Sequence, residues 1–119
     1  MPRTLAALAA LSVLALAPQA LAHAHLASSE PTAKSTVAAP RQVTLRFTEA
    51  LNPKFSGAAM TMPQMAAMAA PAKVTFSPDN LSMILTPGAA LPAGAYKVSW
   101  HAVTADTHRT QGDFVFTVK

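Results

Sequence analysis

Short segments that alternate apolar and polar residues, with prolines in the gaps between them, constrain the fold of this chain most. Three segments, 41–48, 96–100 and 114–118, have an apolar residue at every second position, so these apolar side chains lie on one face of an extended chain. This is the pattern of a half-buried strand. Weaker candidate strands with shorter patterns are 25–29, 57–62, 73–76 and 82–86. Because proline cannot donate a hydrogen bond to a strand pair, its confinement to the gaps supports these boundaries.

About seven short strands and no helical segment of useful length predict an all-β fold. Turn signals at 77–80 and 91–94 separate neighbouring strands. We therefore expect a Greek-key β-sandwich or barrel of about seven antiparallel strands. The residues expected to form most of its aromatic core are Phe47, Tyr96, Val98, Trp100, Phe114 and Phe116.

The first 22 residues differ from the rest and read as a signal peptide. A basic start is followed by an apolar run at 5–16 and by an Ala-x-Ala site at 20–22. The run is short for a spanning helix, which needs about 20 residues, although an uncleaved membrane anchor is the alternative. We expect cleavage after Ala22, which leaves residues 23–119 as one exported domain.

Composition excludes several classes of function. The 119-residue chain has no cysteine, so it has no disulfide framework, thiolate metal site or cysteine nucleophile. Only 12% of residues are charged and the net charge of +4 is scattered, so nucleic acid is not an expected partner. Packing alone must stabilise the domain in an oxidising compartment.

His23, which the expected cleavage exposes, carries two nitrogen donors. A free α-amine and its own imidazole can chelate one ion, and such a pair suits Cu(II), which favours tetragonal N and O ligation. The amine has an unperturbed pKa of about 7.7–8.0, so the ion must displace a proton near neutral pH. The alternative is an incidental, solvated histidine at the cleavage site.

A second candidate site lies in residues 104–109, between the last two strong strands, and is therefore expected to be a loop. Asp106 and His108 are two residues apart and can face one point. His108 can supply a further nitrogen, and Asp106 an axial oxygen or a hydrogen bond that orients an imidazole. The alternative is a turn-forming aspartate beside a solvated histidine.

Four methionines fall within residues 60–68, where Pro63 prevents a helix, so we expect a loop. Thioethers are soft ligands that select Cu(I) and need no deprotonation. The alternative is a hydrophobic flap packed on the sandwich, because methionine often fills gaps in cores. The candidate Cu(I) ligands are Met60, Met62, Met65 and Met68.

The remaining histidines and one acid are less specific. His101 is expected at the surface or rim, and Glu49 is either a carboxylate near the metal or a plain surface acid. His25 offers an alternative copper site, in which the amine, two backbone amides and its imidazole wrap Cu(II). Ala24 permits this chelate because, unlike proline, it has an amide proton. We expect the chelate only if the N-terminus is loose.

Several segments together carry a family resemblance. They are His-Ala-His-Leu-Ala-Ser-Ser-Glu-Pro at 23–31, Leu-Arg-Phe-Thr-Glu at 45–49, the methionine segment, Leu-Pro-Ala-Gly-Ala-Tyr-Lys-Val-Ser-Trp at 91–100 and Ala-Asp-Thr-His at 105–108. In this order they resemble the CopC-type periplasmic copper-binding proteins over essentially all of residues 23–119. The resemblance implies an Ig-like seven-stranded sandwich or barrel, often with an inner-membrane partner of CopD type.

The resemblance also implies which residues hold copper. It assigns Cu(II) to His23, Asp106 and His108, with Glu49 as a weak ligand or supporting carboxylate. It assigns Cu(I) to the four methionines, as an all-thioether site, because no histidine lies between Met60 and Pro71.

We therefore predict a non-enzymatic periplasmic protein that sequesters copper or delivers it to a membrane partner, and that does not itself span the membrane after cleavage. Two other classes stay open. An N-terminal histidine on a β-sandwich is also typical of copper-dependent oxidative enzymes, although this chain has one Trp and one Tyr for a substrate face. The third class is a metal-free structural or adhesion sandwich.

Overall fold

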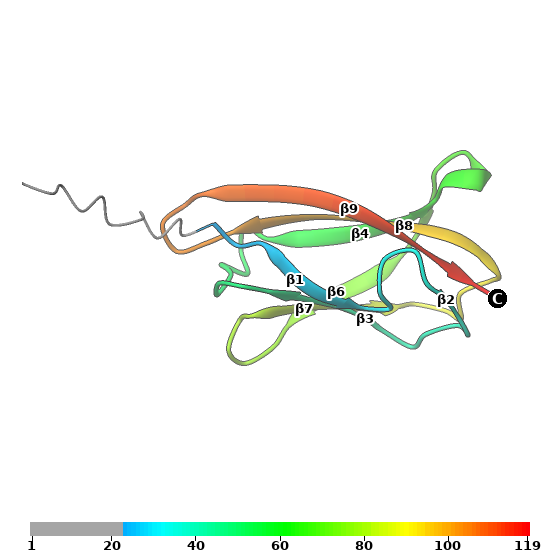
Figure 1. Cartoon of the computed structure of the whole chain (residues 1–119), viewed down its shortest axis with the longest axis horizontal. Helices are drawn as coiled ribbons and strands as arrows, with labels where there is room; N and C mark the ends of the chain where they lie inside the picture. Colours follow the sequence, from blue (N-terminus) through cyan, green and yellow to red (C-terminus); the bar gives the residue numbers. More distant parts are fainter. Residues whose placement is uncertain (1–22) are drawn as a thin grey trace, which may run out of the picture.

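The computed structural model describes residues 23–119; the predicted signal peptide lies outside them. These residues form nine strands and one short 3-10 turn (Figure 1). In chain order the elements are β1 (Leu26–Glu30), β2 (Thr36–Val37), β3 (Val43–Phe47), β4 (Gly57–Met62), η1 (Pro63–Met65), β5 (Met68–Ala70), β6 (Ala72–Phe76), β7 (Ser82–Pro87), β8 (Gly94–Val103) and β9 (Arg109–Val118). Within residues 23–119 no helix is long and apolar enough to cross a bilayer.

Two sheets pack face to face as a β-sandwich. One has the strand order β1-β3-β7-β6 and the other the order β2-β9-β8-β4-β5. Neighbours in the sheets are often distant in the chain, as in Greek-key folds. The predicted all-β sandwich is thus confirmed.

All seven predicted strands are present, with two differences. The seven predicted strands pair antiparallel with one another, as predicted. The short strands β2 and β5 are additional, and β2 pairs with β9 in parallel. Strands β8 and β9 are also longer than predicted. They pair over ten residues each, from Gly94 opposite Val118 to Val103 opposite Arg109. The backbone ladder continues where polar residues such as Gln111 interrupt the apolar alternation.

The core lies between the sheets and contains the predicted aromatic residues. Phe47, Tyr96 and Phe116 are almost fully buried, and Phe114 is buried as well. Each large apolar side chain of this kind contributes about 1.5–3 kcal/mol on burial. Trp100 is only partly buried and packs edge-on against Phe47, with ring centroids 5.1 Å apart.

Tyr96 anchors the turn that leads into β8 through a side-chain hydrogen bond. Its hydroxyl donates a 2.6 Å hydrogen bond to the carbonyl oxygen of Pro92, and its ring stacks on Phe116. A tyrosine bonded to the backbone a few residues upstream is a hallmark of Greek-key sandwiches. Burial raises the pKa of Tyr96, so the hydroxyl remains a donor.

The two regions that contain the candidate copper ligands lie at opposite ends of the sandwich. Figure 1 shows the β4–β5 hairpin at one end and the β8–β9 loop at the other. Strand β8 connects them, because its first residues adjoin the hairpin and Thr104 follows its last. Ten strand residues span about 33 Å.

Candidate metal centre

The segment before β1 is held against the end of the sandwich. Ala24 is 1% exposed, and its carbonyl oxygen accepts a 2.6 Å hydrogen bond from the Thr110 hydroxyl. The backbone N–H of His25 donates to Thr48 Oγ1 at 3.0 Å, and its carbonyl accepts from the Thr48 N–H at 2.9 Å. These bonds fix the position of His23 beside the β8–β9 loop. Sequence reasoning missed both threonines.

The structure brings His23 and His108 together. Their ring centroids lie 4.7 Å apart, with the ring planes inclined at 65°. Nδ1 of His23 is buried and has no hydrogen-bond partner. Leaving a buried polar atom unsatisfied costs about 1–3 kcal/mol, which a metal ion would relieve. Nδ1 is also the ring nitrogen that can close a six-membered chelate with the α-amine of the same residue.

Asp106 orients His108. Its Oδ2 lies 2.8 Å from His108 Nδ1, and its Oδ1 accepts from the His108 backbone N–H at 3.3 Å and from the Thr104 hydroxyl. The Thr104 hydroxyl, and after it His108, lower the pKa of Asp106 to about 2. An ionised Asp106 holds the proton on Nδ1 of His108, which leaves Nε2 as the nitrogen available to a metal.

A strained turn presents these two side chains. Thr107 has φ 69°, a left-handed conformation that β-branched residues rarely adopt. Its N–H donates to the Thr104 carbonyl at 2.9 Å, and the Thr104 N–H donates back to the His108 carbonyl at 3.2 Å. Such strain persists where the surrounding structure imposes it, and it is concentrated at functional sites. The predicted loop between the last two strands is confirmed.

Side chains alone do not complete a metal site. Within residues 23–119 no three His, Asp, Glu or Cys side chains are grouped closely enough to hold an ion. Glu49 is exposed just after β3 and, among these residues, forms no hydrogen bond or ion pair. The α-amine that the predicted cleavage before His23 would create is a further nitrogen donor at this position. The role of Glu49 stays a prediction.

The four methionines do not share one environment. The prediction that 60–68 is a loop is wrong at both ends, because Met60 and Met62 belong to β4 and Met68 begins β5. They are 2% and 8% exposed, whereas Met65 and Met68 are 53% and 51% exposed. Met62 pairs directly with Met68 across the hairpin, so their side chains share a face. Two thioethers, Met65 and Met68, are thus exposed, and two, Met60 and Met62, are in the core.

Gln64 holds the methionine hairpin against β8. With its amide oriented to satisfy both groups, its nitrogen donates to the Ala95 carbonyl at 3.1 Å and its oxygen accepts from the Ala95 N–H at 3.3 Å. A Cβ on Gly94 would lie 2.5 Å from the Gln64 side chain and 3.3 Å from Cε of Met62. Only glycine therefore fits at this position, whose φ is +142°.

Comparison with known proteins decides the family. Residues 26–119 match the family model described as the CopC domain. The chain belongs to the CopC family. It is 46% identical over 113 residues to copper resistance protein C of Escherichia coli, with 90% of each chain covered. It is also 39% identical over 115 residues to protein YobA of E. coli strain K12, covering 95% of this chain and 92% of that protein.

Solved structures of CopC-family proteins share the fold. The crystal structure of PcoC, a methionine-rich copper resistance protein from E. coli, superposes with a TM-score of 0.77 at 48% identity, covering 82% of this chain and all of that one (100%). CopC from Methylosinus trichosporium OB3b gives a TM-score of 0.74 at 26% identity, covering 82% of this chain and 94% of that one. The matches support the predicted β-sandwich and the copper-resistance family.

Proposed function

We propose that this CopC-family protein binds Cu(II) in the periplasm through the His23 amine, His23 Nδ1 and His108 Nε2. The observation that supports it most is the unpartnered, buried Nδ1 of His23 beside a His108 ring that Asp106 orients. Three neutral nitrogens with a carboxylate next to them suit the tetragonal preference of Cu(II). Removal of residues 1–22 is part of the proposal, since it creates the amine.

The anchored N-terminal segment favours this site over the local chelate at His25. That chelate needs the backbone nitrogens of Ala24 and His25 as deprotonated ligands. The His25 N–H, however, is donated to Thr48, and the Ala24 carbonyl is held by Thr110. Forming the local chelate would break at least these two hydrogen bonds, each worth about 0.5–1.5 kcal/mol, and expose the buried Ala24 side chain.

Cu(I) is proposed to bind the exposed hairpin at the other end through Met62, Met65 and Met68. Met65 and Met68 are about half exposed, and Met62, although 8% exposed, pairs directly with Met68 and so lies beside it. Met60 was predicted as a fourth ligand, but it is 2% exposed and pairs with Ala70, not with a methionine, so it is left out of the proposed set.

The separation of the two sites bears on how copper is handled. About 33 Å of strand β8 lies between them, so no single ion is shared and neither site depends on the other. We propose that the protein sequesters copper in both oxidation states or delivers it to a membrane partner of CopD type. Such a role is one of binding, with no catalytic step.

The test is competitive Cu(II) titration of the exported protein and two matched variants. His108→Ala should weaken Cu(II) binding by at least about tenfold, because one of three nitrogens is lost. His25→Ala removes an exposed imidazole of the same kind and should leave affinity within about twofold. The reverse pattern, with His25→Ala the damaging change, would show that the local chelate holds the ion.

A further inference from the structure

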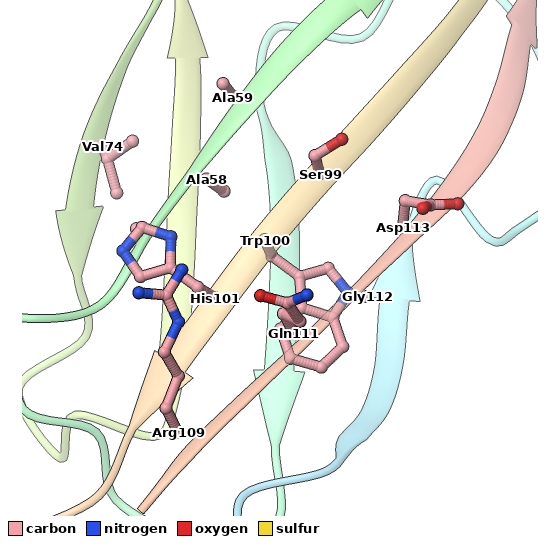
Figure 2. A pocket seen from close by; sticks show the side chains of 11 residues that line it. Ala58, Ala59, Val74, Ser99, Trp100, His101, Arg109, Gln111, Gly112 and Asp113 are labelled. Carbon is pink, nitrogen blue, oxygen red and sulfur yellow. The ribbon is translucent and has the colours of Figure 1, made fainter. Parts of the chain in front are cut away.

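A hollow that the proposed copper sites do not use lies on the outer face of the five-stranded sheet, beside the β8–β9 loop (Figure 2). Its volume is about 750 Å³. Strand pairing places His101 opposite Gln111 on β9 and opposite Gly57 on β4. The polar side chains that line it are Ser99, His101, Arg109, Gln111 and Asp113.

Small residues on β4 create this hollow. Gly57 and Ala59 face it and provide almost no side-chain volume. A Cβ on Gly57 would lie 3.1 Å from Cε1 of His101, so glycine lets the imidazole lie close to the β4 backbone. The sheet surface is therefore open above β4 and walled by the longer side chains of β8 and β9.

One end of the hollow carries an unneutralised cation. Figure 2 shows the Arg109 guanidinium beside the His101 ring, and burial, then the Arg109 charge, lowers the pKa of His101. Within residues 23–119 Arg109 forms no ion pair with a carboxylate; Asp113 is instead 3.9 Å from Lys97. A planar guanidinium without an acceptor matches the two oxygens of a carboxylate.

We propose that the hollow binds the carboxylate of a small organic monoanion, with Arg109 as the ion-pairing group and His101 and Gln111 as hydrogen-bonding groups. The site requires no copper, so it goes beyond the copper-binding function. Asp113 lies four residues along β9 from Arg109, about 13 Å away, and its charge is paired with Lys97. The single unpaired arginine therefore balances one negative charge, which favours a monocarboxylate over a dianion such as phosphate.

The test is titration of the metal-free exported protein with sodium butyrate. Sodium phosphate and sodium chloride at equal ionic strength serve as comparators. Trp100, which lines the hollow and is the single tryptophan of the chain, reports binding by fluorescence. Backbone amide shifts at 99–101 and 109–112 give a second readout. Butyrate should saturate both signals.

Two arginine variants decide the outcome. Arg109→Gln should weaken butyrate binding by about tenfold or more, since hydrogen bonds to charged groups contribute about 1.5–3 kcal/mol. Arg41→Gln, the same change outside the hollow, should have no effect. The proposal is overturned if butyrate gives no saturable change, if chloride or phosphate reproduces it, or if Arg109→Gln binds as the unmodified protein does.

Discussion

His23 and His108 come from opposite ends of the described residues 23–119, yet their rings lie 4.7 Å apart and inclined at 65°. The contact depends on tertiary structure, because β1 and β9 belong to different sheets. Hydrogen bonds from Thr110 to Ala24 and from His25 to Thr48 close the gap between the sheets at this end. The proposed metal centre would therefore depend on the fold and would not survive unfolding of β1.

Asp106→Asn should weaken Cu(II) binding by about 10–100-fold, the usual effect of losing a carboxylate that orients a histidine ligand. The amide cannot both accept from the Thr104 hydroxyl and hold the Nδ1 proton of His108 as a carboxylate does. Asp113→Asn, an exposed aspartate on β9, is the control and should leave affinity unchanged. If the unmodified protein, Asp106→Asn and Asp113→Asn bound Cu(II) equally well, Asp106 would have no role in the site.

The acid stability of the loop follows from the low pKa of Asp106, about 2. Because this folded-state value lies below the ordinary 3.8, ionised Asp106 stabilises the folded loop above about pH 4, and that contribution is lost as the pH falls towards 2. Carbon-13 NMR of the carboxyl group should give a midpoint near pH 2, and the Thr104 hydroxyl bond should persist to that pH. A midpoint near 3.8 would contradict the hydrogen-bond network.

Thr107→Gly should stabilise the protein by about 1 kcal/mol. Relief of the strained φ of 69° outweighs the larger backbone entropy of glycine. Cu(II) affinity should stay within about twofold, since Thr107 contributes no ligand. Chemical denaturation measures the change in stability, and copper titration measures the Cu(II) affinity. A less stable variant would mean that the Thr107 side chain stabilises the turn in some other way.

The methionines should divide into two classes under substitution. Met60→Ala should reduce the free energy of unfolding by about 2–5 kcal/mol, as expected for a core methionine. Met65→Ala and Met68→Ala should change it by less than about 0.5 kcal/mol, because both side chains are about half exposed. Only the latter two should weaken Cu(I) capture. Undiminished Cu(I) affinity in the Met65→Ala, Met68→Ala double variant would exclude the hairpin site.

Alternation of side chains made the sandwich predictable, because a half-buried strand needs apolar residues on one face only. It did not predict the full length of β8 and β9, where polar residues such as Gln111 line an exposed face while the backbone ladder continues. The same limit explains the methionine error. Met60 and Met62 share the inward face of β4, but a cluster of methionines around Pro63 obscures a period of two.

The Asp-x-His pattern predicted the loop that holds His108, because both side chains must reach one point. The threonines around it could not be identified this way. Thr48 and Thr110 matter through long-range contacts with residues 24 and 25, which no local pattern encodes. Thr104 is two residues from Asp106, so its hydrogen bond to Asp106 is local, and a turn motif at 104–106 was the one signal that could have identified it.

The measurement that tests the account most directly compares Cu(II) binding by the exported protein before and after selective acetylation of its N-terminal amine. If the amine and Nδ1 of His23 form the chelate, acetylation should weaken binding by at least about a hundredfold and remove one nitrogen from the electron paramagnetic resonance spectrum. Unchanged affinity and an unchanged spectrum, or an exported protein that still carries residues 1–22, would contradict it.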